Sequence, residues 1–562
     1  MLLNFNAPVG YSKKPLNSAL STIKTPESWV ELPKSGAFSL EQLPTDVVLL
    51  ILRFTGQLDV LNLACTSSTM ANLCLCRIHD TIIVDSSYTP FNKEHSLGAT
   101  YVNLLFYFKK LLRTYNGKYA IRKFSVVDLP DLFNVYDAEL NNLIKLFLAR
   151  LNHLNELVWL LDGFRLEHLM QLSEHNLSRI DVKVYTSSHP SETKRRILKA
   201  DFPDLKALSL SPIPTLRKLA ELLKEFLSSH STKLDALALS RYNSKLASFV
   251  PTAEELSSLD ESVDTTHRAD LETDSLTTIF ETMRPDVYGS LTQLTLEHML
   301  VSFKDAELLR ASVNMTQISL LRLSNISEYE IEESRLQEHG FLGRLGPLLV
   351  KLEHLQLDFR ETQRDTIGPF LRCVNSLSSL DLVVRMNEVK KSHINLEAVY
   401  LQYIAALQKH SFLRKLSLEF REESQNCDAV ENAPLHFIDN LKCFSQLSSL
   451  RISSGNEHHK QRLVDLLRHL SKLRVLDDYG THAGGAPNLG LGMVHPNVFD
   501  EWFKVQHVAF LYQQAQCQLQ YVRIKKRIFE FEDGTVNPRV GIDRWFENRV
   551  RVLNNNCVPK GE

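Results

Sequence analysis

The residues that could bind a metal or form disulfides are few and scattered. The chain holds eight cysteines in 562 residues, and the closest pair is Cys74-x-Cys76. That spacing differs from the CxxC of zinc and redox sites, and no second pair follows it. We therefore expect no metal site and no disulfide framework. Reduced thiols fit a protein of the cytoplasm or nucleus.

The sequence also lacks the common catalytic motifs. Gly484-Gly485 and Gly490-x-Gly492 precede neither a Lys-Ser/Thr pair nor a helix fitted to a strand, so they indicate a loop. His458 and His459 are adjacent in a polar stretch, and adjacent residues do not share a helix face. No GxSxG elbow and no HExxH helix is present. We expect a non-catalytic protein without a cofactor.

Charge and hydrophobicity restrict the partners further. The 64 basic and 66 acidic residues give a net charge of -2, so no global field draws the chain to nucleic acid or to an anionic membrane. The N-terminus has no basic segment followed by an apolar one, and we expect no signal peptide. The longest apolar stretch, Val47–Leu52, is far shorter than the roughly 20 residues of a membrane span. Proteins remain as the expected partners.

The elements that carry any function fall into four predicted segments. Residues 1–36 lack periodicity and are predicted to be a flexible leader. Residues 37–80 predict three short helices, the first capped by Thr45 with Asp46 at the positive end of its dipole. Residues 81–490 predict a repeat array, and residues 491–562 a cap and tail.

The repeat array follows from a recurring pattern, apolar-x-x-apolar-x-apolar, which predicts short strands. Amphipathic helices are predicted between copies, clearest at 215–228, 397–409 and 460–470. Strand and helix in alternation predict an α/β solenoid with parallel strands on its concave side. The copies begin at Ile121, Leu154, Leu177, Leu205, Leu234, Leu291, Ile318, Leu352, Leu377, Leu413, Leu447 and Leu473.

Two segments interrupt or follow the repeats. Residues 252–283 hold nine carboxylates against one cation, which predicts a mobile acidic insertion, either a solvated loop or one that contacts a client or is phosphorylated. After the last repeat, alternation over 521–531 with a turn at Asp533-Gly534 predicts a hairpin that caps the solenoid. Lys525-Lys526-Arg527 is interpreted as a solvated face rather than an anion site.

The first helical segment resembles an F-box. The match begins at Leu43-Pro44, continues through Asp46 and an apolar helix to Ile51-Leu52, and ends in a Leu-rich helix. Met70 stands where the family commonly has Trp, and Met also fills irregular apolar pockets. With the repeats that follow, the whole layout is similar to F-box/leucine-rich-repeat proteins.

That resemblance implies a function. The F-box would bind the Skp adaptor of a cullin-RING ubiquitin ligase, and the solenoid would hold a protein client near the ubiquitin carrier, so that catalysis is by proximity. A separate interpretation is that the apolar helix residues pack only on the first repeats. The adaptor-facing residues implied by the resemblance are Leu43, Pro44, Ile51, Leu52, Leu58, Leu61 and Met70.

The client surface is predicted from strand alternation, which points the residues between the leucines to the concave face. Early copies offer small groups such as Ala207 and Ser209, and later copies are more polar, so residues 291–455 are predicted to set specificity. The candidate client residues are Arg322, His354, Gln356, Asp358, Asp381, Lys415, Glu419 and Arg451.

Two other functions remain open. One is an F-box scaffold that uses its adaptor outside degradation, and the other is a repeat scaffold with no F-box function. The repeats also lack the Asn and Cys that recur in the most regular leucine-rich families, which indicates a diverged solenoid.

Overall fold

The computed structural model divides into two compact units, Met1–Val48 and Leu49–Glu562. The described residues are 40–86, 88, 97–129, 138–165, 168, 172, 176–185, 202–211, 227, 230, 233–240, 276, 280, 288–328, 340–360, 366–375, 377–387, 396–423, 428–431, 433–455, 457–479, 497–532, 534–540 and 542–552. The predicted leader (1–36), the loop at 484–492 and nearly all of the predicted helix 215–228 and acidic insertion 252–283 lie outside them.

The described part of the first unit is a turn and the start of a helix. The turn is η2 (Leu40–Gln42), and helix α1 (Thr45–Arg53) begins after it. The Pro44 carbonyl accepts two N–H groups of the first helical turn. Asp46 lies in that turn, as predicted, where the helix dipole favours a carboxylate. Thr45, predicted to cap the helix, is its first residue.

The second unit begins within α1 and adds two helices. Gly56, in an extended conformation, precedes α2 (Gln57–Ala64). Ser67 caps α3 (Ser68–Asp80), because its hydroxyl accepts a backbone N–H of the first turn at 3.2 Å. With 13 residues, α3 is longer than the short helix that the sequence predicted, and the first strand follows it directly.

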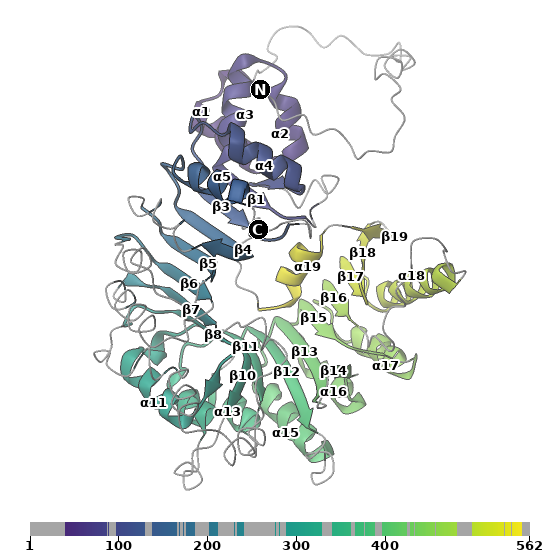
Figure 1. Cartoon of the computed structure of the whole chain (residues 1–562). Coiled ribbons are helices and arrows are strands. Elements are labelled where there is room, and N and C mark those ends of the chain that lie inside the picture. The colour runs from purple at the N-terminus through teal and green to yellow at the C-terminus, as the bar shows by residue number, and fades with distance from the viewer. Residues whose placement is uncertain are drawn as a thin grey trace, which may run out of the picture. The chain divides into compact units, whose positions relative to one another are not determined.

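A long sheet occupies the rest of the second unit. Its strands pair in parallel from β2, β1 and β3 through β17, with β14 and the last two strands antiparallel (Figure 1). The strands are β1 (Thr81–Val84), β2 (Thr100–Val102), β3 (Lys123–Val126), β4 (Glu156–Arg165), β5 (Arg179–Tyr185), β6 (Ala207–Ser211), β7 (Ala236–Ser240), β8 (Gln293–Glu297), β9 (Leu300–Val301), β10 (Leu320–Glu328), β11 (His354–Arg360), β12 (Ser379–Asn387), β13 (Lys415–Glu423), β14 (Asp428–Glu431), β15 (Ser449–Ile452), β16 (Val475–Asp478), β17 (Tyr521–Ile524), β18 (Arg527–Glu532) and β19 (Thr535–Arg539).

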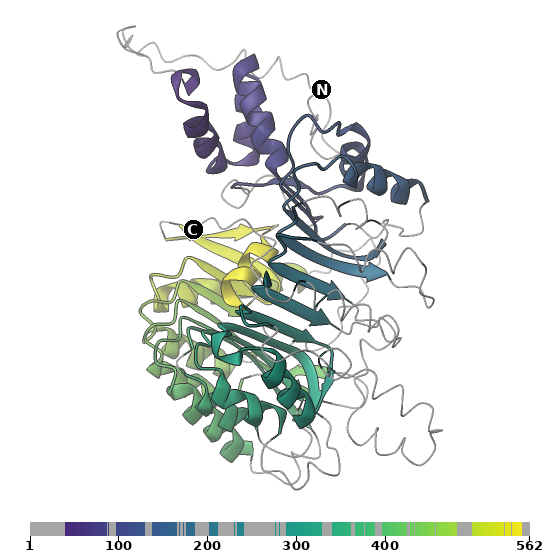
Figure 2. The same ribbon diagram turned by 90° about the vertical axis from the view of Figure 1, so that its left-hand side faces the viewer.

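Most helices of the second unit lie along one face of this sheet, whereas α19 lies on the other (Figures 1 and 2). We call the face that carries α19 the inner face. Helices α15 and α17 fall at the predicted positions 397–409 and 460–470. The helices are α4 (Leu105–Thr114), α5 (Ala138–Leu148), α11 (Phe303–Ser312), α12 (Phe341–Leu345), α13 (Ile367–Cys373), α15 (Leu396–Gln408), α16 (Leu435–Asn440), α17 (Glu457–Leu467), α18 (Asn497–Ala515) and α19 (Asp543–Val550), with 3-10 turns η6 (Met315–Gln317), η8 (Gly346–Leu348) and η9 (Leu441–Cys443).

The strand register explains the repeating leucines. Leu294, Leu321, Leu355, Leu380 and Leu416 are aligned across successive strands. All five are buried, and each adds to one continuous core between the sheet and its helices. The prediction of a solenoid-like α/β repeat with a parallel-dominated sheet is confirmed.

Two buried histidines satisfy backbone groups between repeats. His230 Nε2 accepts the N–H of Phe202 at 3.0 Å, and His410 Nδ1 accepts the N–H of Leu377 at 3.1 Å. In each case the N–H belongs to the repeat before. A buried N–H without an acceptor destabilises the fold, so each histidine stabilises it by supplying that acceptor. These repeats lack the Asn that recurs in the most regular leucine-rich families.

The C-terminal strands form two hairpins rather than one. The predicted turn near Gly534, where φ is +79°, joins β18 to β19. A second turn, which the sequence analysis missed, joins β17 to β18 at Lys525 and Lys526, with Lys525 at φ +57°. Both lysines are exposed.

Candidate functional site

The cysteines and the other possible metal ligands of the described residues are considered first. Among them, no three His, Cys, Asp or Glu side chains are grouped to hold a metal ion. Cys74 is buried, which raises the pKa of its thiol, whereas Cys76 is exposed. Of the helices described, none is long and apolar enough to cross a membrane.

Helix α1 exposes an apolar stripe. Leu50, Ile51 and Phe54 are 53%, 40% and 68% exposed, and Val47 precedes them at 39%. Their spacing of i, i+3, i+4 and i+7 places them on one side of the helix. Leu52, at the opposite position, is fully buried. Much of the surface of these side chains is exposed, so the stripe is available to a partner.

The residues predicted to face an adaptor divide by exposure. Pro44 and Ile51 are exposed, and Leu43, Leu58 and Leu61 are half-buried. Leu52 and Met70 are buried. Adaptor binding by these residues stays a prediction.

Sequence reasoning missed three members of the stripe, Val47, Leu50 and Phe54. Their spacing along the helix could have identified them, because it places them on one side of α1 and places Val48 and Leu52 on the other. Val48 and Leu52 lie four residues apart, and both are buried.

A buried arginine ties α1 to the helix and strand that follow. Arg77, on α3, donates to the Leu52 carbonyl at 3.2 Å, the Thr55 carbonyl at 3.3 Å and the Thr100 hydroxyl at 3.2 Å. The first two acceptors lie at the C-terminal end of α1, where carbonyls lack helical partners. Burial lowers the pKa of the guanidinium, and the nearby Asp80 opposes that shift.

A second polar side chain fixes α2 to the sheet. The Gln57 amide accepts the N–H of Tyr101 at 2.9 Å and donates to the carbonyl of the same residue at 3.2 Å. Gln57 therefore pairs with β2 much as another strand would. Through Gln57 and Arg77, the helices hold a fixed position on the first strands.

The inner face of the sheet carries one row of aligned residues across eleven strands, which we call the central row. Small or neutral side chains occupy its middle strands β6 to β8, and charged ones dominate from β12 onward. Its members are Asp181, Ser209, Ala238, Thr295, Arg322, Gln356, Asp381, Ser417, Arg451, Asp477 and Arg523.

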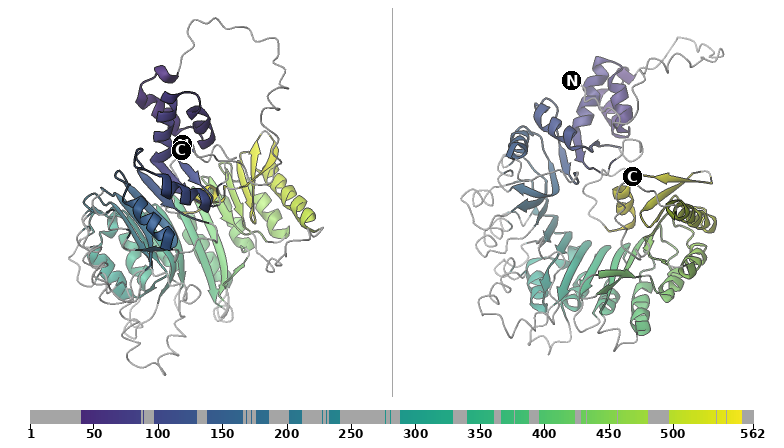
Figure 3. Two further views of the ribbon diagram at one scale, coloured as in Figure 1. Left: turned by 45° about the horizontal axis from the view of Figure 1, so that its top comes forward. Right: turned by 45° about the vertical axis from the view of Figure 1, so that its right-hand side comes forward.

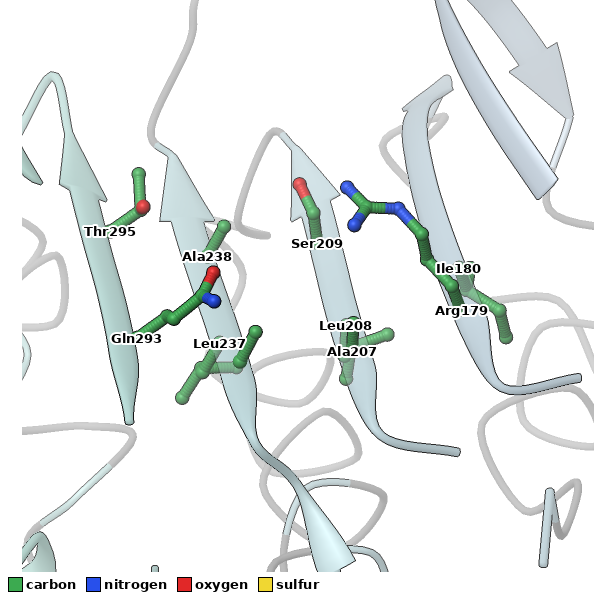
Figure 4. Close-up of a pocket in the computed structure, with 10 residues that line it drawn as sticks. Arg179, Ile180, Ala207, Leu208, Ser209, Leu237, Ala238, Gln293 and Thr295 are labelled. Atoms are coloured by element: carbon green, nitrogen blue, oxygen red, sulfur yellow. The ribbon is translucent and has the colours of Figure 1, made fainter. Parts of the chain in front are cut away.

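The neutral part of the central row forms a shallow hollow over β5 to β8 (Figure 4). Arg179 stands on one side, and Gln293 and Thr295 stand on the other. Arg179 also pairs with Asp181 at 3.1 Å. The floor between them consists of small side chains such as Ser209, so the sheet itself is accessible there.

The charged part of the central row is a buried ion-pair network. Arg451 donates to Glu419 at 2.8 Å and to Asp477 at 3.0 Å, and Arg523 also pairs with Asp477. Burial alone would raise the pKa of Glu419, but Arg451 and Arg421 outweigh it and lower the pKa to about 2. Asp477 and Asp381 are fully buried.

The predicted client residues fall into two groups. One group is buried: Gln356, Asp358, Asp381, Glu419 and Arg451. All of these but Gln356 form ion pairs within the chain: Asp358 with Arg385, Asp381 with Arg551, and Glu419 with Arg451. Arg322, His354 and Lys415 remain partly exposed. Client binding by either group stays a prediction.

Helix α19 packs on the inner face over the charged strands, which the sequence analysis did not predict. It contacts β13, β15 and β16. Its position on the inner face is visible in Figure 3. Arg523, Asp477 and Arg551 were also missed, because they follow the last, degenerate copy of the repeat pattern, where the spacing gives no register.

Comparison with known proteins assigns the helical segment. Residues 40–77 match the family model of the F-box domain. No curated protein matches the sequence. The fold is similar to a solved structure, "Crystal structure of Rad7 and Elc1 complex in yeast", with 13% identity, a TM-score of 0.33, and coverage of 70% of this chain and 85% of that chain. The chain thus carries an F-box domain at its described N-terminal end.

Proposed function

We propose that this chain is a non-catalytic substrate receptor of a cullin-RING ubiquitin ligase. Its F-box domain binds the Skp adaptor, which brings the cullin, and its leucine-rich-repeat solenoid holds a protein client. The observation that carries the proposal is the exposed stripe of Leu50, Ile51 and Phe54 within the F-box match. An amphipathic helix with an exposed apolar face is a common way to dock into a partner's groove.

The connection between helices and sheet supports a receptor. Arg77 and Gln57 hold the F-box helices to β2 through three hydrogen bonds, one to Thr100 and two to Tyr101. Arg77 donates two more to the carbonyls of Leu52 and Thr55 within the helical segment. A ligase that acts by proximity needs a client held at a defined distance from the transferring centre. A flexible linker between the F-box helices and the sheet would let that distance vary widely.

The client surface is proposed to be the inner face. The hollow over β5 to β8 is accessible, and Arg322, His354 and Lys415 continue the polar surface beyond it. The six described free cysteines fit the proposed location in the cytoplasm or nucleus.

The first test is binding of the purified Skp adaptor to the full chain. Phe54→Asp places a charge at the most exposed residue of the stripe, directly after α1, and we expect at least a 30-fold loss of affinity, about 2 kcal/mol, as for an interface hot spot. Phe412→Asp is the matched control, because Phe412 is 69% exposed against 68% for Phe54 and lies before β13. It should bind like the wild type.

The remaining outcomes separate the alternatives. If the adaptor binds and a cullin does not join it, a scaffold with a non-degradative role is favoured. If the wild-type chain does not bind the adaptor at all, the receptor proposal fails and a repeat scaffold without F-box function is left.

A further inference from the structure

Helix α19 occupies the inner face in a way that differs from the other helices. The repeat helices pack against the leucine core on the opposite face, whereas α19 contacts β13, β15 and β16 from the inner side (Figure 1). It is eight residues long, and helices this short are unstable in isolation. Its conformation therefore depends on the surface that it contacts.

One half of that surface is apolar. Ile542, Phe546 and Val550 pack against Val475 and Tyr521 in one buried cluster. Val475 and Tyr521 are adjacent in register, on the inner face beside the central row.

The same inner-face row is polar on the strands before these two. His354, Ser379, Lys415 and Ser449 hold the corresponding positions. The row thus changes from polar to apolar between β15 and β16, where α19 covers it.

The other half of the surface is charged. Arg551 donates to Asp381 at 2.8 Å, and Lys415 Nζ donates to the carbonyl of Asn548 at 3.2 Å. Glu547 forms an ion pair with Arg523. Sheet and helix thus interact through charged side chains at three points, all in the C-terminal half of α19 or directly after it.

An arginine joins the two halves. The Arg523 guanidinium lies 4.9 Å from the ring centroid of Phe546, next to its ion pair with Glu547. Arg523 thus contacts both the aromatic ring of Phe546 and the carboxylate of the next residue, Glu547. Arg549 and Asp543, by contrast, are exposed, and the Arg549 guanidinium lies over the Trp545 ring.

We propose that the inner face over β12 to β17 is a binding surface for a short helix, and that α19 occupies it in competition with a client. This rests on the proposed receptor function. The partner is a helical protein segment with the chemistry of α19: an aromatic residue, a carboxylate directly after it and an arginine five residues after the aromatic, as at Phe546, Glu547 and Arg551. α19 acts as a tethered competitor.

Tethering sets the expected size of the effect. A segment joined to its site through a short linker competes at an effective concentration of the order of millimolar. A free helix must overcome that competitor. Weakening the docking of α19 should therefore raise the affinity of a free α19-like peptide at least tenfold.

The experiment titrates a fluorescent peptide of residues 540–552 against the full chain. The undocked variant is Phe546→Asp/Arg551→Glu, and Arg549→Gln is the control, because it removes the charge of an exposed arginine on the same helix without introducing a carboxylate. We expect at least tenfold tighter binding to the undocked variant, and wild-type affinity for the control. Asp381→Asn added to the undocked variant should return the peptide affinity to that of the wild type, because the peptide's own arginine then loses the carboxylate that it binds.

Other results would overturn the proposal. Equal peptide affinity for wild type and undocked variant means that α19 does not compete for the surface. No binding to an undocked variant that retains the wild-type circular dichroism and cooperative unfolding means that the helix docks only as part of the chain. If that variant does not fold, Arg551→Gln replaces it, with the same expectation. Adaptor binding is not measured here, so failure leaves the receptor proposal untouched.

Discussion

Arg551 donates a hydrogen bond from Nε to a carboxylate oxygen of Asp381 at 2.8 Å, across 170 residues of sequence. Asp381 is fully buried, and among the described residues Arg551 is the cation that forms an ion pair with it. Burial alone would lower the pKa of Arg551, but Asp381 outweighs it and raises that pKa. The last described helix is thus held by the sheet it covers.

Asp381→Asn should lower the free energy of unfolding by about 2 kcal/mol, because it removes a charged hydrogen bond and leaves Arg551 without its partner. In a double-mutant cycle with Arg551→Gln, we expect a coupling of about 1–3 kcal/mol. The control cycle uses Asp465 and Arg468, which form an exposed pair at 3.0 Å and should couple by less than about 0.5 kcal/mol. Equal coupling in the two cycles would contradict the expectation.

Acid should weaken the ion-pair network through Glu419. Its pKa is about 2 in the fold against an ordinary value of 4.5, so the unfolded chain binds the proton first. The stabilisation is present above pH 4.5 and is lost as pH falls toward 2, by an amount of the order of 3 kcal/mol. Melting temperatures of wild type and Glu419→Gln should converge as pH falls from 6 to 3. A gap that stays constant would rule out Glu419 as the titrating group.

Much of the fold could be predicted from the sequence because its cause is local. The leucine pattern places side chains such as Leu321 and Leu355 at the same register position in successive strands, and the core follows from that repetition. The exposed stripe on α1 could also have been predicted in full from the helical spacing of its apolar residues, although only Ile51 of these was assigned to the adaptor surface. Leu52 was assigned to the adaptor surface because the motif contains it, although its position opposite Phe54 on the helix buries it.

The covering of the inner face could not be predicted, because it depends on a contact between distant segments. Alternation correctly pointed Asp381 and Arg451 away from the leucine core. It could not indicate that another part of the chain would lie there, since Phe546 and Arg551 carry no repeat signal. The same applies to His410, whose role depends on an N–H 33 positions earlier.

His410→Ala should destabilise the fold by about 2 kcal/mol or more, because the buried N–H of Leu377 loses its acceptor. Burial lowers the pKa of His410, so the unfolded chain takes up the proton first, and the stabilisation is lost as pH falls below about 6.5. The difference in melting temperature between wild type and variant should therefore shrink from pH 7.5 to pH 5. His469→Ala, at an exposed position before β16, serves as the control and should show no such trend.

Arg77→Ala should loosen the end of the F-box helices. Removing the guanidinium leaves the carbonyls of Leu52 and Thr55 without their donor, which we expect to cost about 2–4 kcal/mol locally. Hydrogen exchange in α1 and α2 should then speed up while exchange in β10 to β13 stays unchanged. Arg77→Lys should not restore protection, because an ammonium cannot reach three acceptors arranged for a planar fork.

The control for Arg77 is Arg53→Ala, which removes an exposed arginine from α1 itself. It should leave exchange in the helices at the wild-type rate. The variant at Arg77 should also keep its affinity for the adaptor within about threefold, because the stripe lies on the other side of the helix from Leu52, whose carbonyl Arg77 contacts. What should fall is the rate of ubiquitin transfer to a bound client, because its distance from the transferring centre is no longer fixed. Unchanged exchange in α1, or full transfer despite faster exchange, would show that the Arg77 contacts do not set this geometry.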